Sequence, residues 1–219
     1  MSHVTIDVSP SLEGYQDVLG SSFKASYNTA DDVWSDEPAM RKVLPLLLER
    51  LNPDSHVLDV GAGRGRDTLQ MLQAGHSVDA LDLAVTSDWA ALIACWPERL
   101  SFIEGELLTV QLERRYDAVL DNGCLHHQHP ESYEAYLRKL WQYTLSDGVL
   151  VVSFFTPSGV ANAGTLWLQH DGRLTRDFTE AEARALLQTA GWMVEQTAVV
   201  PRQSGAHHYL VVVARRAGE

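Results

Sequence analysis

The stretch VLDVGAGRGRDT, residues 57–68, decides the fold of this chain. An apolar run leads into three glycines, Gly61, Gly63 and Gly65, that alternate along the loop. Glycine allows positive φ and lets a ligand approach the backbone, and the start of the following helix offers unpaired N–H groups. The stretch therefore predicts a strand, a ligand-binding turn and a helix, the first unit of a doubly wound α/β sheet.

The sequence on either side of this loop alternates between short apolar runs and helical patterns. Helices are predicted at 67–74, 87–95 and 130–145, and a further helix at 180–190 begins with Thr179 and Glu182 as a capping box. Strands are predicted at 56–60, 77–82, 99–104, 117–121, 149–155, 192–200 and 207–215. This alternation predicts a mostly parallel sheet with helices on both faces.

Three segments lie outside that alternation. Apolar residues from Met40 to Leu51 share one helical face in a helix predicted to begin at Ser35, although Pro45 should kink or split it. Residues 156–178 form an insertion in which Asp171-Gly172 predicts the turn of a β-hairpin near 165–176. We expect this hairpin, an N-terminal helical segment in 1–34 and the turn at 203–208 to lie over the acceptor site.

The composition favours a single domain of 219 residues, made of a cap at 1–34 and a core at 35–219. No apolar run approaches the ~20 residues of a membrane span, and the first residues do not resemble a secretory signal. Cys95 and Cys124 lie far apart without CxxC spacing. They are typical of free thiols in a reducing compartment, which predicts a cytoplasmic protein.

The charge balance argues against polyanionic partners. Seventeen Lys and Arg against twenty-nine Asp and Glu give a net charge of −12, and no basic run interrupts the chain. Nucleic-acid-binding proteins and proteins of anionic membranes usually carry a basic patch. We therefore expect a small-molecule substrate, neutral or cationic, and neither nucleic acid nor membrane as a partner.

The spacing of the glycines indicates which nucleotide the loop binds. A dinucleotide fingerprint, GxGxxG, needs a small residue where this chain has Arg66, and a P-loop needs a lysine that the loop lacks. The remaining pattern is DxGxGxG, led by Asp59. A carboxylate there would repel a pyrophosphate but suits the ammonium and sulfonium of S-adenosylmethionine (SAM). Asp82, at the end of the second strand, can accept ribose hydroxyls.

Residues from about 34 to 152 resemble the class I SAM-dependent methyltransferases. The glycine loop with Asp59 resembles their first motif, Asp82 their ribose-binding acid and Asp121 their fourth motif, and 121–155 is similar to the thiopurine- and tellurite-resistance-type branch. The resemblance implies a Rossmann-like seven-stranded sheet of order 3-2-1-4-5-7-6 with its last strand antiparallel. It also implies SAM as cofactor and S-adenosylhomocysteine (SAH) as product. Glu106 stands where an aspartate is more usual.

The cofactor contacts that this predicts all follow strand ends. They are Asp59, Gly61, Ala62, Gly63, Arg64, Gly65, Asp67, Thr68, Asp82, Leu83, Glu106, Leu107, Asp121, Asn122 and Gly123.

The segment after the fourth strand should face the methyl acceptor. It lacks the [DN]-P-P-[YF] motif of enzymes that methylate the amino groups of DNA and glutamine, so that substrate class is not expected. Asp121, His126 and His127 are the candidate catalytic residues, with His126 preferred as a general base because histidine titrates near neutrality. Packing of these rings is the alternative, and the HHQH spacing predicts no metal site. Candidate acceptor walls are Tyr27, Trp34, Cys124, Trp167 and His170.

These observations predict a SAM-dependent methyltransferase that acts on N, O or S of a small metabolite by in-line displacement. Two alternatives remain at this point, a nicotinamide-dependent oxidoreductase and a non-catalytic module that binds SAM or another nucleotide. The oligomeric state is expected to be a monomer or a homodimer.

Overall fold

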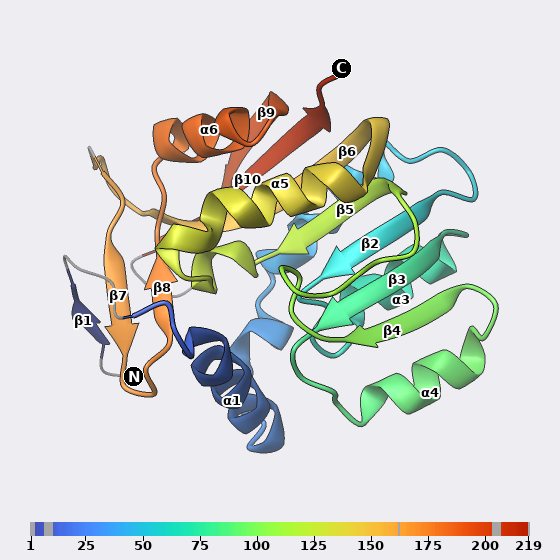
Figure 1. Cartoon of the computed structure of the whole chain (residues 1–219), viewed down its shortest axis with the longest axis horizontal. Coiled ribbons are helices and arrows are strands. Elements are labelled where there is room, and N and C mark those ends of the chain that lie inside the picture. The colour runs from blue at the N-terminus through green and yellow to red at the C-terminus, as the bar shows by residue number, and fades with distance from the viewer. Residues whose placement is uncertain (1–2, 7–10, 162, 203–206, 219) are drawn as a thin grey trace.

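Seven strands form one twisted sheet in the order β4-β3-β2-β5-β6-β10-β9 (Figure 1). The computed structural model describes residues 3–6, 11–161, 163–202 and 207–218. In chain order the strands of this sheet read 3-2-1-4-5-7-6, and β10 runs antiparallel to both of its neighbours. The predicted fold class is thereby confirmed. The strands are β2 (His56–Val60), β3 (Ser77–Asp82), β4 (Leu100–Glu104), β5 (Tyr116–Asn122), β6 (Thr144–Pro157), β9 (Trp192–Val200) and β10 (His207–Arg216).

Helices cover the sheet on both faces because the central strands are apolar on both sides. Leu58 and Val60 face a core shared with α5 (Tyr133–Tyr143) and α6 (Glu180–Thr189). Val57 faces the opposite core, shared with α2 (Leu44–Leu48), α3 (Arg66–Gln73) and α4 (Asp88–Cys95). Thr179 begins α6 with both hydrogen bonds of the predicted capping box. The result is the three-layer arrangement of a doubly wound domain.

A second, three-stranded sheet stands beside the carboxyl ends of the parallel strands. Its order is β1 (His3–Thr5), β7 (Leu166–Gln169) and β8 (Leu174–Arg176). Strands β7 and β8 form the predicted hairpin, with Gly172 at φ +85° in its turn. Helix α1 (Tyr15–Asn28) packs on this sheet through Tyr15 and Leu19, and Figure 1 shows both elements beside the ends of β2–β5. Strand β1 has no counterpart in the sequence predictions.

Two predicted helices differ from the observed ones. The single helix expected from residue 35 is broken into η1 (Val33–Asp36), η2 (Met40–Lys42) and α2, with Pro45 in the first turn of α2, where its missing N–H costs nothing. Ser35 donates a hydrogen bond to Asp32 and does not cap a helix. The helix expected at 130–145 consists of η4 (Pro130–Ser132) and α5, and β6 already begins at Thr144.

Within the described ranges, no helix has the length and apolar character needed to cross a bilayer. The expected turn at 203–208 lies in part outside the described residues, because 203–206 are not among them.

Candidate active site

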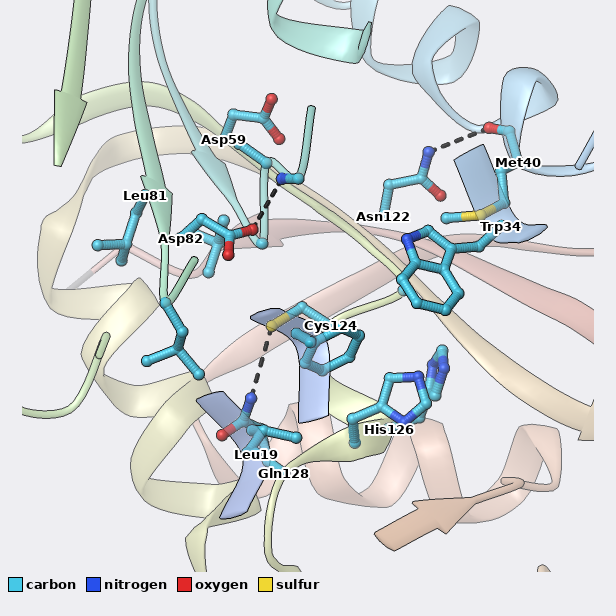
Figure 2. A pocket seen from close by; sticks show the side chains of 18 of the residues that line it. Leu19, Trp34, Met40, Asp59, Leu81, Asp82, Asn122, Cys124, His126 and Gln128 are labelled. Atoms are coloured by element: carbon cyan, nitrogen blue, oxygen red, sulfur yellow. Dashed lines mark hydrogen bonds between the residues drawn. The ribbon is translucent and has the colours of Figure 1, made fainter. Parts of the chain in front are cut away.

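A pocket of about 510 Å³ opens at the carboxyl ends of β2–β5. Its floor comes from the loops that follow these strands, and its walls come from α1, the segment 33–41, η3 (Leu125–His127) and the hairpin β7–β8 (Figure 2). The volume lies within the roughly 300–1,000 Å³ of small-ligand sites. This is the edge of the sheet where the strand order reverses between β2 and β5, the usual ligand position in doubly wound folds.

Gly61 lies at the centre of this edge. Its φ is +71°, and a Cβ on it would stand 2.7 Å from the Cβ of Cys124 in the loop after β5. No larger residue fits without moving that backbone. The two loops at the reversal point are therefore in contact, and Gly61 presents bare backbone to the pocket.

Asp82 ends β3 inside the pocket and organises the glycine loop. Its carboxylate is buried and accepts hydrogen bonds from the N–H groups of Gly63, at 2.7 Å, and Ala84, at 2.8 Å (Figure 2). Burial raises the pKa of this carboxyl. Each oxygen keeps a second lone pair, so the group can still accept from a pair of hydroxyls. This fits a ribose.

Asp59 is buried on the same side of the pocket, and it accepts a hydrogen bond of 2.5 Å from Thr68. Burial and the neighbouring charge of Asp67 raise the pKa of Asp59 to about 7. Asp67 is held by Arg66 at 2.8 Å and by the Asn122 amide at 2.6 Å. A cationic group in the pocket would favour the ionised form of Asp59, which suits the ammonium of SAM.

Most of the expected cofactor residues line the pocket, and three do not. Gly65 packs against α4, where a Cβ would come within 2.6 Å of Leu92. Thr68 lies behind Asp59. Asp121 is fully buried and accepts hydrogen bonds from the N–H groups of Cys124 and Leu125 and from the Tyr136 hydroxyl. The remaining ones on the pocket wall are Asp59, Gly61, Ala62, Gly63, Arg64, Asp67, Asp82, Leu83, Glu106, Leu107, Asn122 and Gly123.

The Asp121 carboxylate therefore points away from the pocket, into the turn after β5. Its hydrogen bonds hold the turn that carries Cys124 and η3 in place. The expectation that it acts directly in the reaction is corrected to a positioning role, because its carboxylate faces the turn and is absent from the pocket lining among the described residues.

His126 and His127 both line the pocket, and burial lowers the pKa of both rings. The His126 ring stacks on Phe155 at 4.1 Å, and burial lowers its pKa to about 3. Burial, His126 and Arg173 hold the pKa of His127 well below its usual range. Its Nδ1 lies 3.2 Å from the Leu174 carbonyl oxygen and 3.1 Å from the Thr175 hydroxyl oxygen, so both contacts hold the ring from the side of β8. These downward shifts of the pKa disfavour titration near neutrality, the property on which the expected role of His126 as a general base rests.

Of the five residues expected to form the walls of the acceptor site, three line the pocket and two do not. Tyr27, Trp34 and Cys124 line the pocket. Burial raises the pKa of the Cys124 thiol, so it is no nucleophile. Trp167 packs against His207 with ring centroids 4.5 Å apart, outside the lining, and His170 is exposed at the turn of the hairpin.

Several residues that line the pocket were not predicted from the sequence. Phe23 is among them, although the spacing of Leu19, Phe23 and Tyr27 at every fourth position would have placed all three on one face of α1. Further unpredicted pocket residues come from segments where no local pattern marks them: they include Phe155 of β6, Arg173 of the hairpin, Arg202 after β9 and Tyr209 of β10.

Comparisons with known proteins agree with this geometry. A family model described as a methyltransferase domain matches residues 34–197. The 1,6-didemethyltoxoflavin-N1-methyltransferase of Burkholderia thailandensis, crystallised with 1,6-didemethyltoxoflavin and SAH, is 40% identical. That match covers 99% of this chain and 95% of the other, with a TM-score of 0.93.

Two further relatives are more distant. A TehB-like SAM-dependent methyltransferase from Corynebacterium glutamicum has 17% identity and a TM-score of 0.62, with 88% of this chain and 98% of the other covered, and it supports the fold alone. An uncharacterized methyltransferase from Staphylococcus carnosus is 26% identical over 99 residues, 45% of this chain. The match spans about half the length, 46%, of that curated relative.

The chain belongs to the methyltransferase-domain family. The predicted class, a SAM-dependent methyltransferase of small molecules, is confirmed over the nicotinamide-dependent alternative.

Proposed function

We propose that this chain transfers the methyl group of SAM to a ring nitrogen of a small, flat heterocycle. Bound in the pocket, SAM supplies an electrophilic methyl carbon on a positively charged sulfur. The chain's residues then have to position the acceptor nitrogen in line with that carbon and exclude water, which is the main requirement for this reaction.

The observation that carries the proposal is the 40% identity, over almost the whole chain, to a methyltransferase named for a ring position, N1. The acceptor half of the pocket supports it. The rings of Phe23 and Trp34 meet edge-on at 5.6 Å, and Phe155 lies beyond them against His126 and Tyr209. Aromatic walls of this kind favour a flat ring system.

The residues of the cofactor half take the following roles in the proposal. Asp82 accepts the ribose hydroxyls, and the loop from Gly61 to Gly63 lies against the nucleoside. Asp59 and Asp67 face the ammonium end, and Glu106 and Leu107 lie beside the adenine edge. This assignment is supported by the presence of all these residues in the lining of the pocket.

The acceptor half contributes orientation and a dry environment. His127 is held by Leu174 and Thr175 through its Nδ1, while His126 packs against Phe155 as part of the wall. Neither ring is assigned as the base, because both pKa values are depressed. Tyr27 and Trp34, from α1 and the adjoining turn, close the pocket.

The organisation of the chain is part of the proposal. Residues 1–219 act as one domain in which 1–34 and the insertion 156–178 form the cap over the acceptor. Leu19, Phe23 and Tyr27 on α1 and Gln169 and Arg173 on the hairpin support this assignment, because all of them line the pocket. We also propose a cytoplasmic monomer or homodimer without a nucleic-acid partner. The two free cysteines and the charge of −12 support it.

The test is a turnover assay with SAM and 1,6-didemethyltoxoflavin, followed by mass spectrometry of both products. The expected outcome is a product heavier by one methylene unit, formed in equal amount to SAH, with the methyl on nitrogen by NMR. An Asp82→Ala variant serves as the matched control and should form neither product at the same SAM concentration. Tight SAH binding without methylation of this or any related ring nitrogen, or methylation at oxygen or sulfur, would overturn the proposal.

A further inference from the structure

Arg173 stands out among the charged groups of the acceptor half. It precedes β8 in the hairpin, lines the pocket and is only 5% exposed. Its guanidinium lies over the ring of Phe23 at 4.7 Å and near the ring of Trp34 at 5.7 Å. The cation is therefore built into the aromatic wall that faces the acceptor.

The hydrogen bonds of this guanidinium are incomplete. Its Nη2 donates to the amide oxygen of Gln169 at 3.0 Å. Its Nε and Nη1 have no hydrogen-bond partner among the residues that the structure describes. Buried donors are nearly always satisfied, so two open donors on one buried cation point to a group that is bound during function.

The other arginines of the pocket differ from Arg173 because each has a carboxylate nearby. Within the described chain five arginines line it, and four have a carboxylate oxygen within 4 Å. Arg41 faces Asp36, Arg64 faces Asp32, Arg66 faces Asp67 and Arg202 faces Glu37, at 3.9, 2.7, 2.8 and 3.3 Å. Arg173, the fifth, has none in the described chain.

The groups that face Arg173 do not neutralise it by contact. Asp171 is occupied by the hydroxyl of Ser22 at 2.6 Å and by the backbone N–H of Arg173 itself. Asp31 acts only from a distance, and burial raises the pKa of Tyr15 and of Tyr27, so both phenols stay neutral. An unpaired buried cation is costly unless a ligand brings the counter-charge.

We infer that the acceptor binds as its conjugate base, with an anionic carbonyl-type oxygen on the open Nε and Nη1 of Arg173. The ligand class is a flat heterocycle whose ring N–H is acidic because the negative charge spreads onto a neighbouring oxygen. This rests on the proposed function and narrows it. It also replaces the neutral or cationic substrate that the net charge of −12 had led us to expect.

The chemistry balances without a protein base. The acceptor loses its proton to solvent on binding. Its nitrogen lone pair then forms the bond to the methyl carbon while the carbon–sulfur bond breaks and its electron pair stays on sulfur. One positive and one negative charge disappear together, a change that a dry, low-dielectric pocket favours. The neutral His126 and His127 are compatible with this scheme, since no imidazole has to take a proton.

The test measures binding of 1,6-didemethyltoxoflavin to the SAH-saturated protein by calorimetry from pH 5 to 9, in two buffers of different ionisation enthalpy. Below the compound's own pKa, binding should release one proton, and the bound compound should show the absorption spectrum of its anion. Arg173→Gln should weaken binding about 10- to 100-fold and abolish the proton release. The matched control, Arg138→Gln on the exposed face of α5, should behave as the original chain.

A stability measurement separates recognition from a packing role. Because Arg173 is an unpaired buried cation in the free protein, Arg173→Met should melt at the same temperature or higher while it loses acceptor affinity. A lower melting temperature together with unchanged acceptor affinity would overturn the inference.

Failure of the proposed function is distinguishable from failure of this inference. If 1,6-didemethyltoxoflavin does not bind, the acceptor assignment is wrong, and the inference is then tested with lumazine and its non-ionisable 1,3-dimethyl counterpart. The inference expects lumazine to bind at least tenfold more tightly, and only when Arg173 is present. Equal binding, no binding by either compound, or binding without proton release contradicts it.

Discussion

The two halves of the pocket are built by different means. The cofactor half consists of backbone and carboxylates at the ends of consecutive strands, with Gly61, Asp59 and Asp82 at its centre. The acceptor half consists of aromatic rings and arginines from distant segments, with Phe23 from α1, Arg173 from the hairpin and Phe155 from β6. The first half presents the carboxylates of Asp59 and Asp82, and the second presents the guanidinium of Arg173, which has no carboxylate within 4 Å among the described residues.

The two halves also depend on different parts of the fold. The cofactor half depends on the sheet, because its residues end strands whose register is fixed by hydrogen bonds. The acceptor half depends largely on α1 and the hairpin β7–β8, which lie outside that sheet, and Phe155 of β6 is its contribution from the sheet. A cationic methyl donor and an anionic acceptor would each meet the half of opposite charge, so charge as well as shape directs the two ligands to their places.

The largest effect is expected from Asp82→Ala, which should weaken binding of the cofactor. The change removes the two proposed ribose contacts and the acceptor of the Gly63 N–H, so SAH affinity should fall about 100-fold. Calorimetry with SAH measures it. An affinity within twofold of the original chain would mean that the ribose lies elsewhere.

The converse experiment is Phe23→Leu, which should weaken only the acceptor half. Loss of the aromatic face beside Arg173 and Trp34 should raise the KM for the acceptor about tenfold. SAH affinity should stay within about twofold of that of the original chain. Asp82→Ala is the comparison variant, because it should weaken SAH binding. If Phe23→Leu weakens SAH as strongly as it weakens the acceptor, the two halves are not separate.

The pH dependence of SAH affinity tests whether the carboxylate of Asp59 contacts the cofactor. The pKa of Asp59 is raised to about 7, so the folded state holds this proton more tightly than the unfolded chain does. The stability that Asp59 contributes is therefore present in acid and lost as the pH rises through about 7. A bound ammonium needs the carboxylate ionised, so SAH affinity should rise about tenfold from pH 6 to pH 8.

Calorimetry at both pH values checks this, and Asp59→Asn should bind with little pH dependence. A flat profile in the original chain would show that Asp59 ionises well below neutrality or does not meet the cofactor.

The smallest effect is expected from Thr179→Ala, which touches neither half. Loss of the cap of α6 should lower the free energy of unfolding by about 1 kcal/mol, measured by urea denaturation. SAH and acceptor affinities should not change. A loss of acceptor binding would show that α6 helps to hold the hairpin over the pocket.

The sequence predicted the sheet and the cofactor half better than the cap, for a physical reason. Gly61, Asp59 and Asp82 follow strands whose apolar runs are visible locally, and β2, β3 and β9 begin and end at the predicted residues. The segments η1, η2 and α2 were predicted as one helix that Pro45 kinks or splits, because the apolar face is buried in either case, as Val43 and Leu47 are.

The acceptor half could not be predicted in the same way. Arg173 reaches the pocket only because the hairpin folds back over the sheet, and no periodicity in the sequence reports that path. The histidines were identified as pocket residues, but their protonation depends on burial and on the charges of Arg173 and Arg202, which only the folded chain brings together.

The most direct test of the two-half account is a crystal structure of the chain with SAH and 1,6-didemethyltoxoflavin together. We expect the ribose hydroxyls on Asp82, the ring system between Phe23, Trp34 and Phe155, and an acceptor oxygen on Arg173, with the ring nitrogen directed at the SAH sulfur. An acceptor bound away from Arg173, or a ribose away from Asp82, would contradict it.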